Sequence, residues 1–306
     1  MDIQNKNRKL LKKNYVYDET MEHDACGVGL VASTEGLKSR KVVEYGIEAL
    51  KAVWHRGAID ADGKTGDGAG VATHLPYKIL LPEAKKLGKE IKSPEDLAVG
   101  VFFLPAGEND HQTKCRVIAE GVLRDRKIGI IGWRKVPVDP SALGQQALDT
   151  MPEIQQLLLE RPEGLDENEF EVELYLSRRE IEDRVNDEGI EDFYICSLSH
   201  RLVNYKGFMV ATAVEEFYLD LQNEDYETAV CLYHQRFSTN TFPTWALSQP
   251  FRMLCHNGEI NTVRGNRNWL NSRIGQFESE VWGDQLKYLN HVIDPDGSDS
   301  ASLDAA

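Results

Sequence analysis

Apolar residues recur along the chain at two different spacings, and each spacing predicts a type of secondary structure. Intervals of three and four positions, which place side chains on one face of a helix, occur within residues 38–57. The stripe there comprises Val43, Ile47, Leu50 and Trp54. Gly57 follows the last of them, and glycine is common just after a helix ends.

Similar spacing predicts further helices over residues 77–88, 112–126, 151–162 and 267–277. In the last of these helices, Trp269, Ile274 and Phe277 are expected to face inward.

Shorter, more continuous apolar runs predict strands. They cover residues 27–34, 68–76, 96–105, 127–138, 193–203, 208–214, 228–238 and 250–258. Strands and helices therefore follow one another in mixed order, without regular βαβ alternation. This order indicates an α+β or layered-sandwich fold rather than a doubly wound parallel sheet.

Composition narrows the class of protein. The 306 residues are 41% hydrophobic and 28% charged, which is enough apolar material for a sizeable core. A net charge of -15 argues against binding to nucleic acid or to an anionic membrane, because both need a basic surface. Much of the charge lies in residues 161–193, which we interpret as a solvated face. No apolar run approaches the length of a membrane span.

The cysteines point to a reducing compartment. There are five, an odd number, and no two have the C-x-x-C spacing. This disfavours a disulfide framework, a zinc site and an iron–sulfur site, so no metal is expected in this chain. Residues 1–25 begin with basic residues but lack the apolar core of a secretory signal, so a cytoplasmic location is expected.

The cysteine at the start of the first predicted strand, Cys26, is a candidate nucleophile. Taken alone, a cysteine in this position is more often a small buried hydrophobic residue. Cleavage of the Ala25–Cys26 bond would, however, free an α-amine with a pKa of about 7.7–8.0, close to the pKa of about 8.5 of a thiol. An amine of that pKa can act as the base for its own side chain, as in N-terminal nucleophiles.

Three other segments carry candidate chemistry, each with a plain structural alternative. Asn257 and Gly258, in "LCHNGEIN", offer a carboxamide and a backbone N–H to an oxyanion, although Asn-Gly also forms tight turns. Arg236 and Thr239, in "YHQRFSTNT", suit a carboxylate, although a surface arginine pairing with an acidic residue is the simpler case. Asp299, in "GSDSASLD", suits an ammonium group, although such loops are often only turns.

The Gly-Lys-Thr sequence at residues 63–65 does not make a phosphate-binding loop. Such a loop needs a glycine five positions before Gly63, where this chain has Ala58, and it needs a preceding strand, where a helix is expected.

Together these segments resemble the glutaminase domain of glutamate synthase, a class II glutamine amidotransferase of the N-terminal-nucleophile type. The resemblance rests on "CGVGLVA", "HRGAIDADGKTGDGAG", "YHQRFSTNTFPTWALSQPFRMLCHNGEINTVRGNRNW" and "GSDSASLD", and it covers nearly the whole chain after residue 25. It implies a four-layer αββα sandwich over residues 26–306, incomplete at its C-terminal side, preceded by a propeptide, residues 1–25.

The resemblance also implies roles for individual residues. Cys26 would be the nucleophile toward L-glutamine, with Asn257 and Gly258 stabilising the oxyanion and Arg56 supporting the nucleophile. Arg236 and Thr239 would hold the substrate carboxylate, and Asp299 its ammonium group.

Cofactors and protein partners are implied only outside this chain. FMN and an iron–sulfur cluster would belong to the synthase region of the full-length polypeptide, and electrons would come from an electron-donating subunit or from ferredoxin.

Two other functions remain open from the residues alone. One is an N-terminal-nucleophile amidase acting on a different amide, against which the pairing of Arg236 with Asp299 favours an amino acid substrate. The other is an inactive binding or scaffolding fragment.

Overall fold

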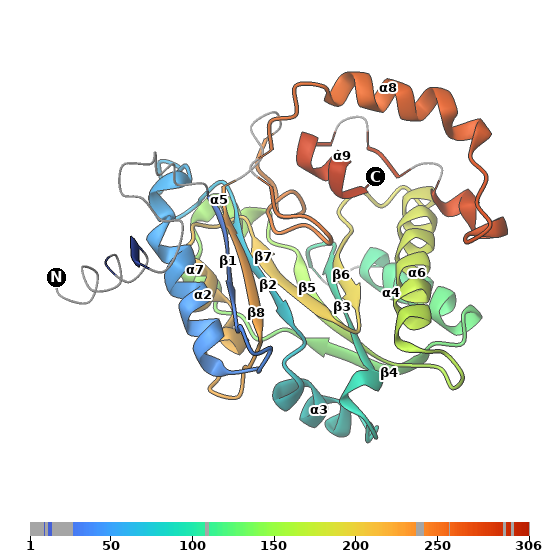
Figure 1. Cartoon of the computed structure of the whole chain (residues 1–306), viewed down its shortest axis with the longest axis horizontal. Coiled ribbons are helices and arrows are strands. Elements are labelled where there is room, and N and C mark those ends of the chain that lie inside the picture. The colour runs from blue at the N-terminus through green and yellow to red at the C-terminus, as the bar shows by residue number, and fades with distance from the viewer. Residues whose placement is uncertain are drawn as a thin grey trace.

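Most of the strands predicted from the apolar runs are present, and the strands form two antiparallel sheets in a computed structural model of the chain (Figure 1). The structure describes residues 9, 12–13, 27–107, 110–236, 242–256, 258–289, 292–294 and 297–305. The first sheet has the order β1-β8-β2-β7, from β1 (Val28–Ala32), β8 (Val230–Gln235), β2 (Ala69–His74) and β7 (Leu202–Gly207). The second has the order β4-β5-β3-β6, from β4 (Gly129–Lys135), β5 (Glu153–Glu160), β3 (Leu97–Leu104) and β6 (Tyr194–Ser199).

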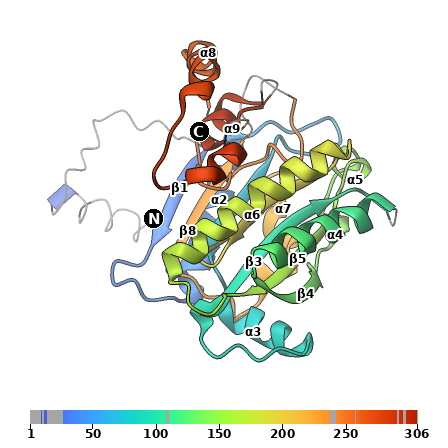
Figure 2. The same ribbon diagram turned by 90° about the vertical axis from the view of Figure 1, so that its right-hand side faces the viewer.

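Helices lie on the outer sides of this pair of sheets. The α-helices are α2 (Arg40–Ala52), α3 (Tyr77–Lys86), α4 (Asp110–Asp125), α5 (Gln145–Asp149), α6 (Glu167–Asp187), α7 (Ala213–Phe217), α8 (Val263–Arg273) and α9 (Asp299–Ala305). Short 3-10 helices are η1 (Trp54–Arg56), η2 (Pro94–Asp96), η3 (Pro140–Ala142), η4 (Leu219–Gln222), η5 (Ile274–Gln276) and η6 (Gly283–Leu289). Figures 1 and 2 show α2 beside β1, and α4 and α6 over the second sheet. The architecture is thus a layered α+β fold.

Strand β3 shows how the layers are held together. All of its side chains are buried, and they alternate between two apolar clusters. Val99, Val101 and Phe103 belong to the larger cluster, which also includes residues of α2, α3 and the first sheet. Phe102 and Leu104 belong to a second cluster shared with α4 and α6. Because successive strand residues point to opposite faces, one short apolar run serves two interfaces.

Three predicted elements are wrong. Residues 151–162 were expected to be helical, but they contain β5, the strand between β3 and β4. Both faces of β5 are covered, and a short continuous apolar run does not distinguish such a strand from a buried helix. Residues 208–214 and 250–258 were expected to be strands, but among their described residues neither forms one.

Several expected side-chain positions are also wrong. Trp54 is 50% exposed, because it lies on η1 rather than on α2 and leaves the buried stripe. Trp269, on α8, is 68% exposed, and Phe277, just after η5, is 37% exposed; neither α8 nor η5 buries any of its residues. Within residues 161–193, expected to be a solvated face, α6 buries Phe170, Leu174 and Ile181 against the second sheet, together with Arg178, Arg179 and Glu180.

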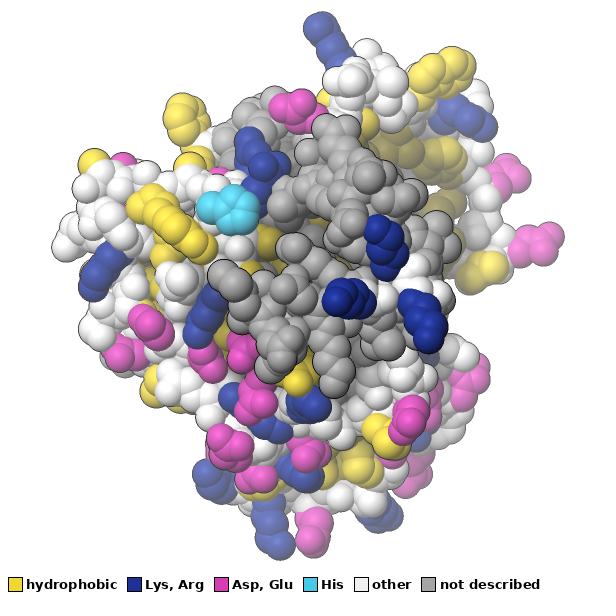
Figure 3. All heavy atoms as spheres, turned by 60° about the vertical axis from the view of Figure 1, so that its left-hand side comes forward, with side chains coloured by type: hydrophobic (Ala, Val, Ile, Leu, Met, Phe, Trp, Pro, Cys, Tyr) yellow, Lys and Arg dark blue, Asp and Glu magenta, His cyan; other side chains and the backbone are white. Residues whose placement is uncertain are grey.

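Charges of both signs are distributed over the surface. On the face seen in Figure 3, lysine and arginine side chains are interspersed with aspartate and glutamate, so neither sign covers the described part of this face alone. Within the described ranges, no helix has the length and apolar character needed to cross a membrane.

Candidate active site

The structure describes four of the seven candidate residues. They are Arg56, Arg236, Gly258 and Asp299. The other three, Cys26, Thr239 and Asn257, lie outside the described residues, as does most of the expected propeptide.

Gly27, the residue after Cys26, is buried where β1 meets the end of β8. Its carbonyl oxygen accepts a hydrogen bond of 2.6 Å from the backbone nitrogen of Gln235. A Cβ atom on Gly27 would lie 2.0 Å from the Gln235 carbonyl oxygen and 3.6 Å from the Cβ of Arg236. This close approach requires glycine at position 27, and it puts Arg236 beside the start of β1.

Arg236 has a constrained backbone. It follows the last residue of β8 with a φ of 112°, a region that side chains other than glycine rarely adopt. Its amide donates a 2.9 Å hydrogen bond to the carbonyl oxygen of Gly68, which fixes the turn. Strained backbone of this kind is often found at functional sites.

Arg56 is brought to the same end of β8 by the turn that follows α2. Its side chain is exposed at the end of η1. A Cβ on the next residue, Gly57, would lie 1.7 Å from the Nε2 of Gln235 and 3.0 Å from the Oδ1 of Asp67. The turn after Arg56 therefore rests directly on the Gln235 side chain.

Gln235 is a residue that sequence reasoning missed. Its carboxamide is fully buried, and neither of its polar atoms has a hydrogen-bond partner within the described part of the chain. Buried amide groups nearly always have a hydrogen-bond partner, so a buried carboxamide without one, packed against Gly57, is unusual. The available signal was a pair of polar residues, His234 and Gln235, at the end of an apolar strand and directly before Arg236.

The second pair of candidates, Gly258 and Asp299, is also brought together. Gly258 is buried with a φ of 81°, and its amide donates a 2.9 Å hydrogen bond to the Nδ1 of His256. Asp299, in the first turn of α9, is 5% exposed and accepts a 2.8 Å hydrogen bond from the amide of Ile260. The Ser300 hydroxyl donates to the carbonyl oxygen of His256 at 3.2 Å.

Two contacts connect the chain before and within this loop to the end of the first sheet. The Sγ of Cys255 lies 3.5 Å from the carbonyl oxygen of Tyr233 in β8. A Cβ on Gly68, the partner of Arg236, would lie 2.8 Å from the Oγ of Ser248. Segments far apart in sequence are thus held at one end of the first sheet.

A cavity near these residues opens beside Asp299. It has a volume of about 960 Å³ and lies between the loop after Gly258, α8 and α9, with His256, Trp269 and Phe277 among its lining residues. A cavity of this volume accommodates a small amino acid.

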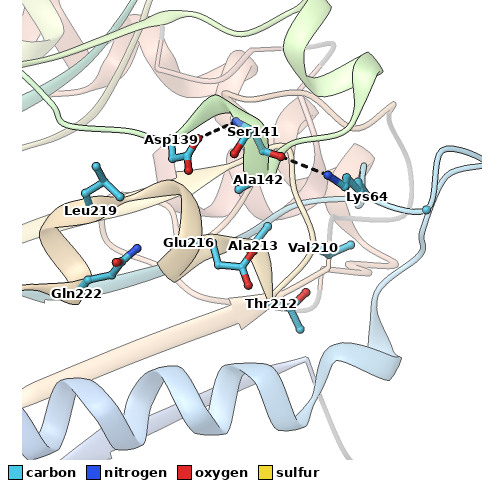
Figure 4. Close-up of a pocket in the computed structure, with 11 residues that line it drawn as sticks. Lys64, Asp139, Ser141, Ala142, Val210, Thr212, Ala213, Glu216, Leu219 and Gln222 are labelled. Carbon is cyan, nitrogen blue, oxygen red and sulfur yellow. Dashed lines mark hydrogen bonds between the residues drawn. The ribbon is translucent and has the colours of Figure 1, made fainter.

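The Gly-Lys-Thr segment borders a different hollow, of about 470 Å³ (Figure 4). Lys64 donates to the carbonyl oxygen of Ser141 there, close to the carboxylates of Asp139 and Glu216. The backbone N–H groups of Lys64 and Thr65 both donate to Asp62. With these donors occupied by a carboxylate, the segment does not present a phosphate cradle.

The state of Asp62 agrees with this hydrogen bonding. The Thr65 hydroxyl, followed by the two backbone N–H groups, lowers the pKa of Asp62 to about 2. The carboxylate therefore stays ionised at neutral pH and keeps these donors. Among the described residues, no group of three His, Cys, Asp or Glu side chains is arranged to hold a metal ion.

Comparison with known proteins identifies the family. The model of the family described as "Glutamine amidotransferases class-II" matches residues 26–306. The chain therefore belongs to the class II glutamine amidotransferases, a family of enzymes, as the sequence motifs predicted.

Among curated proteins, several glutamate synthases are similar to this chain. The chain is 50% identical over 289 residues to the large chain of glutamate synthase (NADPH) of Azospirillum brasilense, covering 94% of this chain and 19% of that protein. It is 40% identical to the ferredoxin-dependent glutamate synthase of Pyropia yezoensis, covering 93% of this chain and 18% of that protein. It is 41% identical to glutamate synthase (NADH) of Saccharomyces cerevisiae, covering 95% of this chain and 14% of that protein. The chain thus spans about a fifth or less of the length of these relatives.

Proposed function

We propose that this chain hydrolyses L-glutamine to L-glutamate and ammonia, with Cys26 as the nucleophile after residues 1–25 are removed as a propeptide. The freed α-amine of Cys26 takes the thiol proton, and the sulfur attacks the side-chain amide carbon. The amine then gives the proton to the leaving nitrogen, which departs as ammonia and leaves a γ-glutamyl thioester. Water hydrolyses the thioester and releases L-glutamate.

The other residues bind the substrate or stabilise charge. Asn257 donates to the oxyanion, and so does the Gly258 N–H once it leaves the His256 Nδ1; such a donor typically contributes about 2.7–4 kcal/mol. Arg236 and Thr239 bind the α-carboxylate, and Asp299 binds the α-ammonium group. Arg56, exposed on the turn that rests on the Gln235 side chain, supports the nucleophile electrostatically.

The single observation that carries the proposal is that the family match begins at residue 26. A family model that begins at this cysteine supports Cys26 as the first residue of the mature chain. The buried position of Gly27, next to Arg236, supports the same assignment.

The other cysteines support the choice of Cys26. Burial raises the pKa of Cys115 to about 11. It raises those of Cys196, Cys231 and Cys255 to about 12. These groups stay protonated at neutral pH, and a thiol is a far weaker nucleophile than a thiolate. All four are free thiols, which also fits the cytoplasmic location that we propose.

We further propose that the ammonia serves a glutamate synthase reaction with 2-oxoglutarate in regions outside this chain. The names of the relatives support this. FMN, an iron–sulfur cluster and the site for ferredoxin or an electron-donating subunit would lie in those regions. The domain itself would be an N-terminal-nucleophile αββα sandwich, consistent with its two antiparallel sheets.

Mass spectrometry of the purified protein tests the proposal. The mature protein should lack residues 1–25, and a glutamine analogue bearing a diazo-ketone should label Cys26, with no label in a Cys26→Ala variant. Glutamine hydrolysis by protein that retains residues 1–25 would overturn the mechanism, as would labelling of Cys115, Cys196, Cys231 or Cys255.

A further inference from the structure

Gln249 holds the residue that precedes the proposed oxyanion pair. Its Nε2 donates to the carbonyl oxygen of His256 at 2.6 Å, and its Oε1 accepts from the His256 backbone nitrogen at 2.8 Å. One fully buried carboxamide therefore engages both main-chain polar groups of His256. Such a two-point contact fixes the orientation of the main chain as well as its position.

The main chain on the other side of this contact is anchored to the first sheet. Lys206 of β7, also fully buried, donates from Nζ to the carbonyl oxygens of Ala246 at 2.8 Å and Ser248 at 2.7 Å. Asn204 of the same strand donates from Nδ2 to the carbonyl oxygen of Phe251 at 2.8 Å. Gln249 lies between these anchored residues, so its side chain extends from a rigid support.

The contact reaches Gly258 through the His256 side chain. The Gly258 N–H donates to the His256 Nδ1, so the place of the imidazole and the direction of this N–H depend on where the His256 main chain lies. Ser300 donates to the same His256 carbonyl oxygen, and the neighbouring Asp299 accepts from Ile260. The loop is thus held on one side by Gln249 and on the other by the start of α9.

We propose that Gln249 is a positioning residue for glutamine hydrolysis, which fixes the oxyanion-stabilising loop through the main chain of His256. This inference rests on the proposed function. Gln249 does not touch the substrate. It acts by fixing the main chain that carries the Gly258 N–H. This N–H donates to the His256 Nδ1 in the structure and would turn to the oxyanion when the tetrahedral intermediate forms. Misplacement of such a donor by about 1 Å can lower the rate about 100-fold.

The expected signature is a fall in kcat with little change in KM. In the full natural polypeptide, Gln249→Met should lower kcat for glutamine hydrolysis by about 10- to 100-fold. KM should stay within about twofold, because Arg236 and Asp299 are not held by Gln249.

Gln249→Glu gives a pH readout that a purely structural role would not produce. An ionised glutamate accepts from the His256 N–H but does not donate to its carbonyl oxygen, whereas a protonated one does both. The ratio of the kcat of this variant to that of the natural protein should therefore rise as pH falls.

Gln156→Met is a matched control. Gln156 is also a fully buried carboxamide, bonded to Tyr205 and Arg134 in the core. Gln156→Met should lower the free energy of unfolding about as much as Gln249→Met does, while kcat per folded molecule stays the same as in the natural protein.

The outcomes separate this inference from the proposed function. If the natural protein is not labelled at Cys26 and does not hydrolyse glutamine, the proposed function fails. If it does both, and Gln249→Met keeps kcat within twofold or loses only as much as Gln156→Met, the positioning role is overturned. Should Gln249→Met not fold, the pH-dependent kcat ratio of Gln249→Glu decides, and a flat ratio rejects the role.

Discussion

The amide nitrogen of Arg236 donates to the carbonyl oxygen of Gly68 at 2.9 Å, while Arg236 itself has a φ of 112°. A residue with a Cβ in this conformation is strained by about 1–3 kcal/mol. The hydrogen bond to Gly68 holds it there. The arginine is therefore kept at this position although glycine would suit the backbone better.

This conflict between backbone and side chain predicts opposite effects on stability and binding. Arg236→Gly should raise the free energy of unfolding by about 1 kcal/mol, because glycine adopts positive φ without strain. The same change should raise KM for glutamine by at least about 10-fold, since a charged pair to the carboxylate is lost. Arg236→Met should raise KM similarly without the gain in stability. Urea unfolding and steady-state kinetics on the two variants check this, and an unchanged KM in both would discredit the carboxylate-binding role.

Asp299 combines a structural bond with a proposed binding charge, and Asp299→Asn separates the two. The amide oxygen of asparagine still accepts from the Ile260 N–H, so the loop should stay in place and the unfolding midpoint should change little. The negative charge toward the substrate ammonium is lost, so KM for glutamine should rise about 10- to 100-fold. Asp299→Ala should lose both functions. Equal KM values for Asp299→Asn and the natural protein would mean that the carboxylate is only a helix-end acceptor.

The apolar pattern predicted most of the first sheet and much of the second. Strands such as β2 and β3 and helices such as α2 have the expected spacing because their own side chains face the core. It failed at β5, whose consecutive leucines fill both faces of a central strand. It also failed at residues 250–258, where Asn204 of β7 holds Phe251 and Lys206 holds Ser248 just before the segment, contacts that no local pattern records.

The residues of the site also fall into two groups: some can be identified from the local sequence, and others only from contacts between residues distant in sequence. The segments containing Arg56, Arg236, Gly258 and Asp299 were identified because their residue types and neighbours are unusual. Gln235 and Gln249 were missed, because a buried glutamine has no periodic signature and its contacts are with residues distant in sequence. Supporting residues of this kind become visible only when the packing is known.

The core contains a buried ion pair whose removal should be costly. Arg134 of β4 donates to both carboxylate oxygens of Asp220, at 2.8 and 2.7 Å, and the Tyr205 hydroxyl donates to the same carboxylate at 2.9 Å. Arg134→Met leaves Asp220 charged, buried and partly unpaired, and should lower the free energy of unfolding by about 3–5 kcal/mol. The double variant Arg134→Met/Asp220→Leu should recover much of that loss. Denaturant unfolding checks this, and a double variant as unstable as the sum of the singles would contradict it.

Lys206 makes stability depend on pH in a calculable direction. Burial is the main cause that lowers its pKa from 10.5 to about 7, and nearby Arg252 lowers it further, against the opposing effects of Cys196 and Asp304. Between pH 7 and 10.5 the unfolded chain therefore binds a proton that the folded chain does not.

Stability should accordingly rise with pH across this window, with a contribution from Lys206 of up to about 1.4 kcal/mol per pH unit, and this contribution should level off below pH 7. The neutral amine still donates to the carbonyl oxygens of Ala246 and Ser248, so the fold is retained throughout.

Urea unfolding at pH 7, 8 and 9 should give a slope of unfolding free energy against pH that is flatter by about 1 kcal/mol per pH unit in Lys206→Met than in the natural protein. All other titrating groups are common to both proteins, so the difference in slope isolates this amine. Identical slopes would mean that Lys206 is protonated in the folded state, held as an ammonium by the two carbonyl groups and the neighbouring rings of Tyr194 and Phe251.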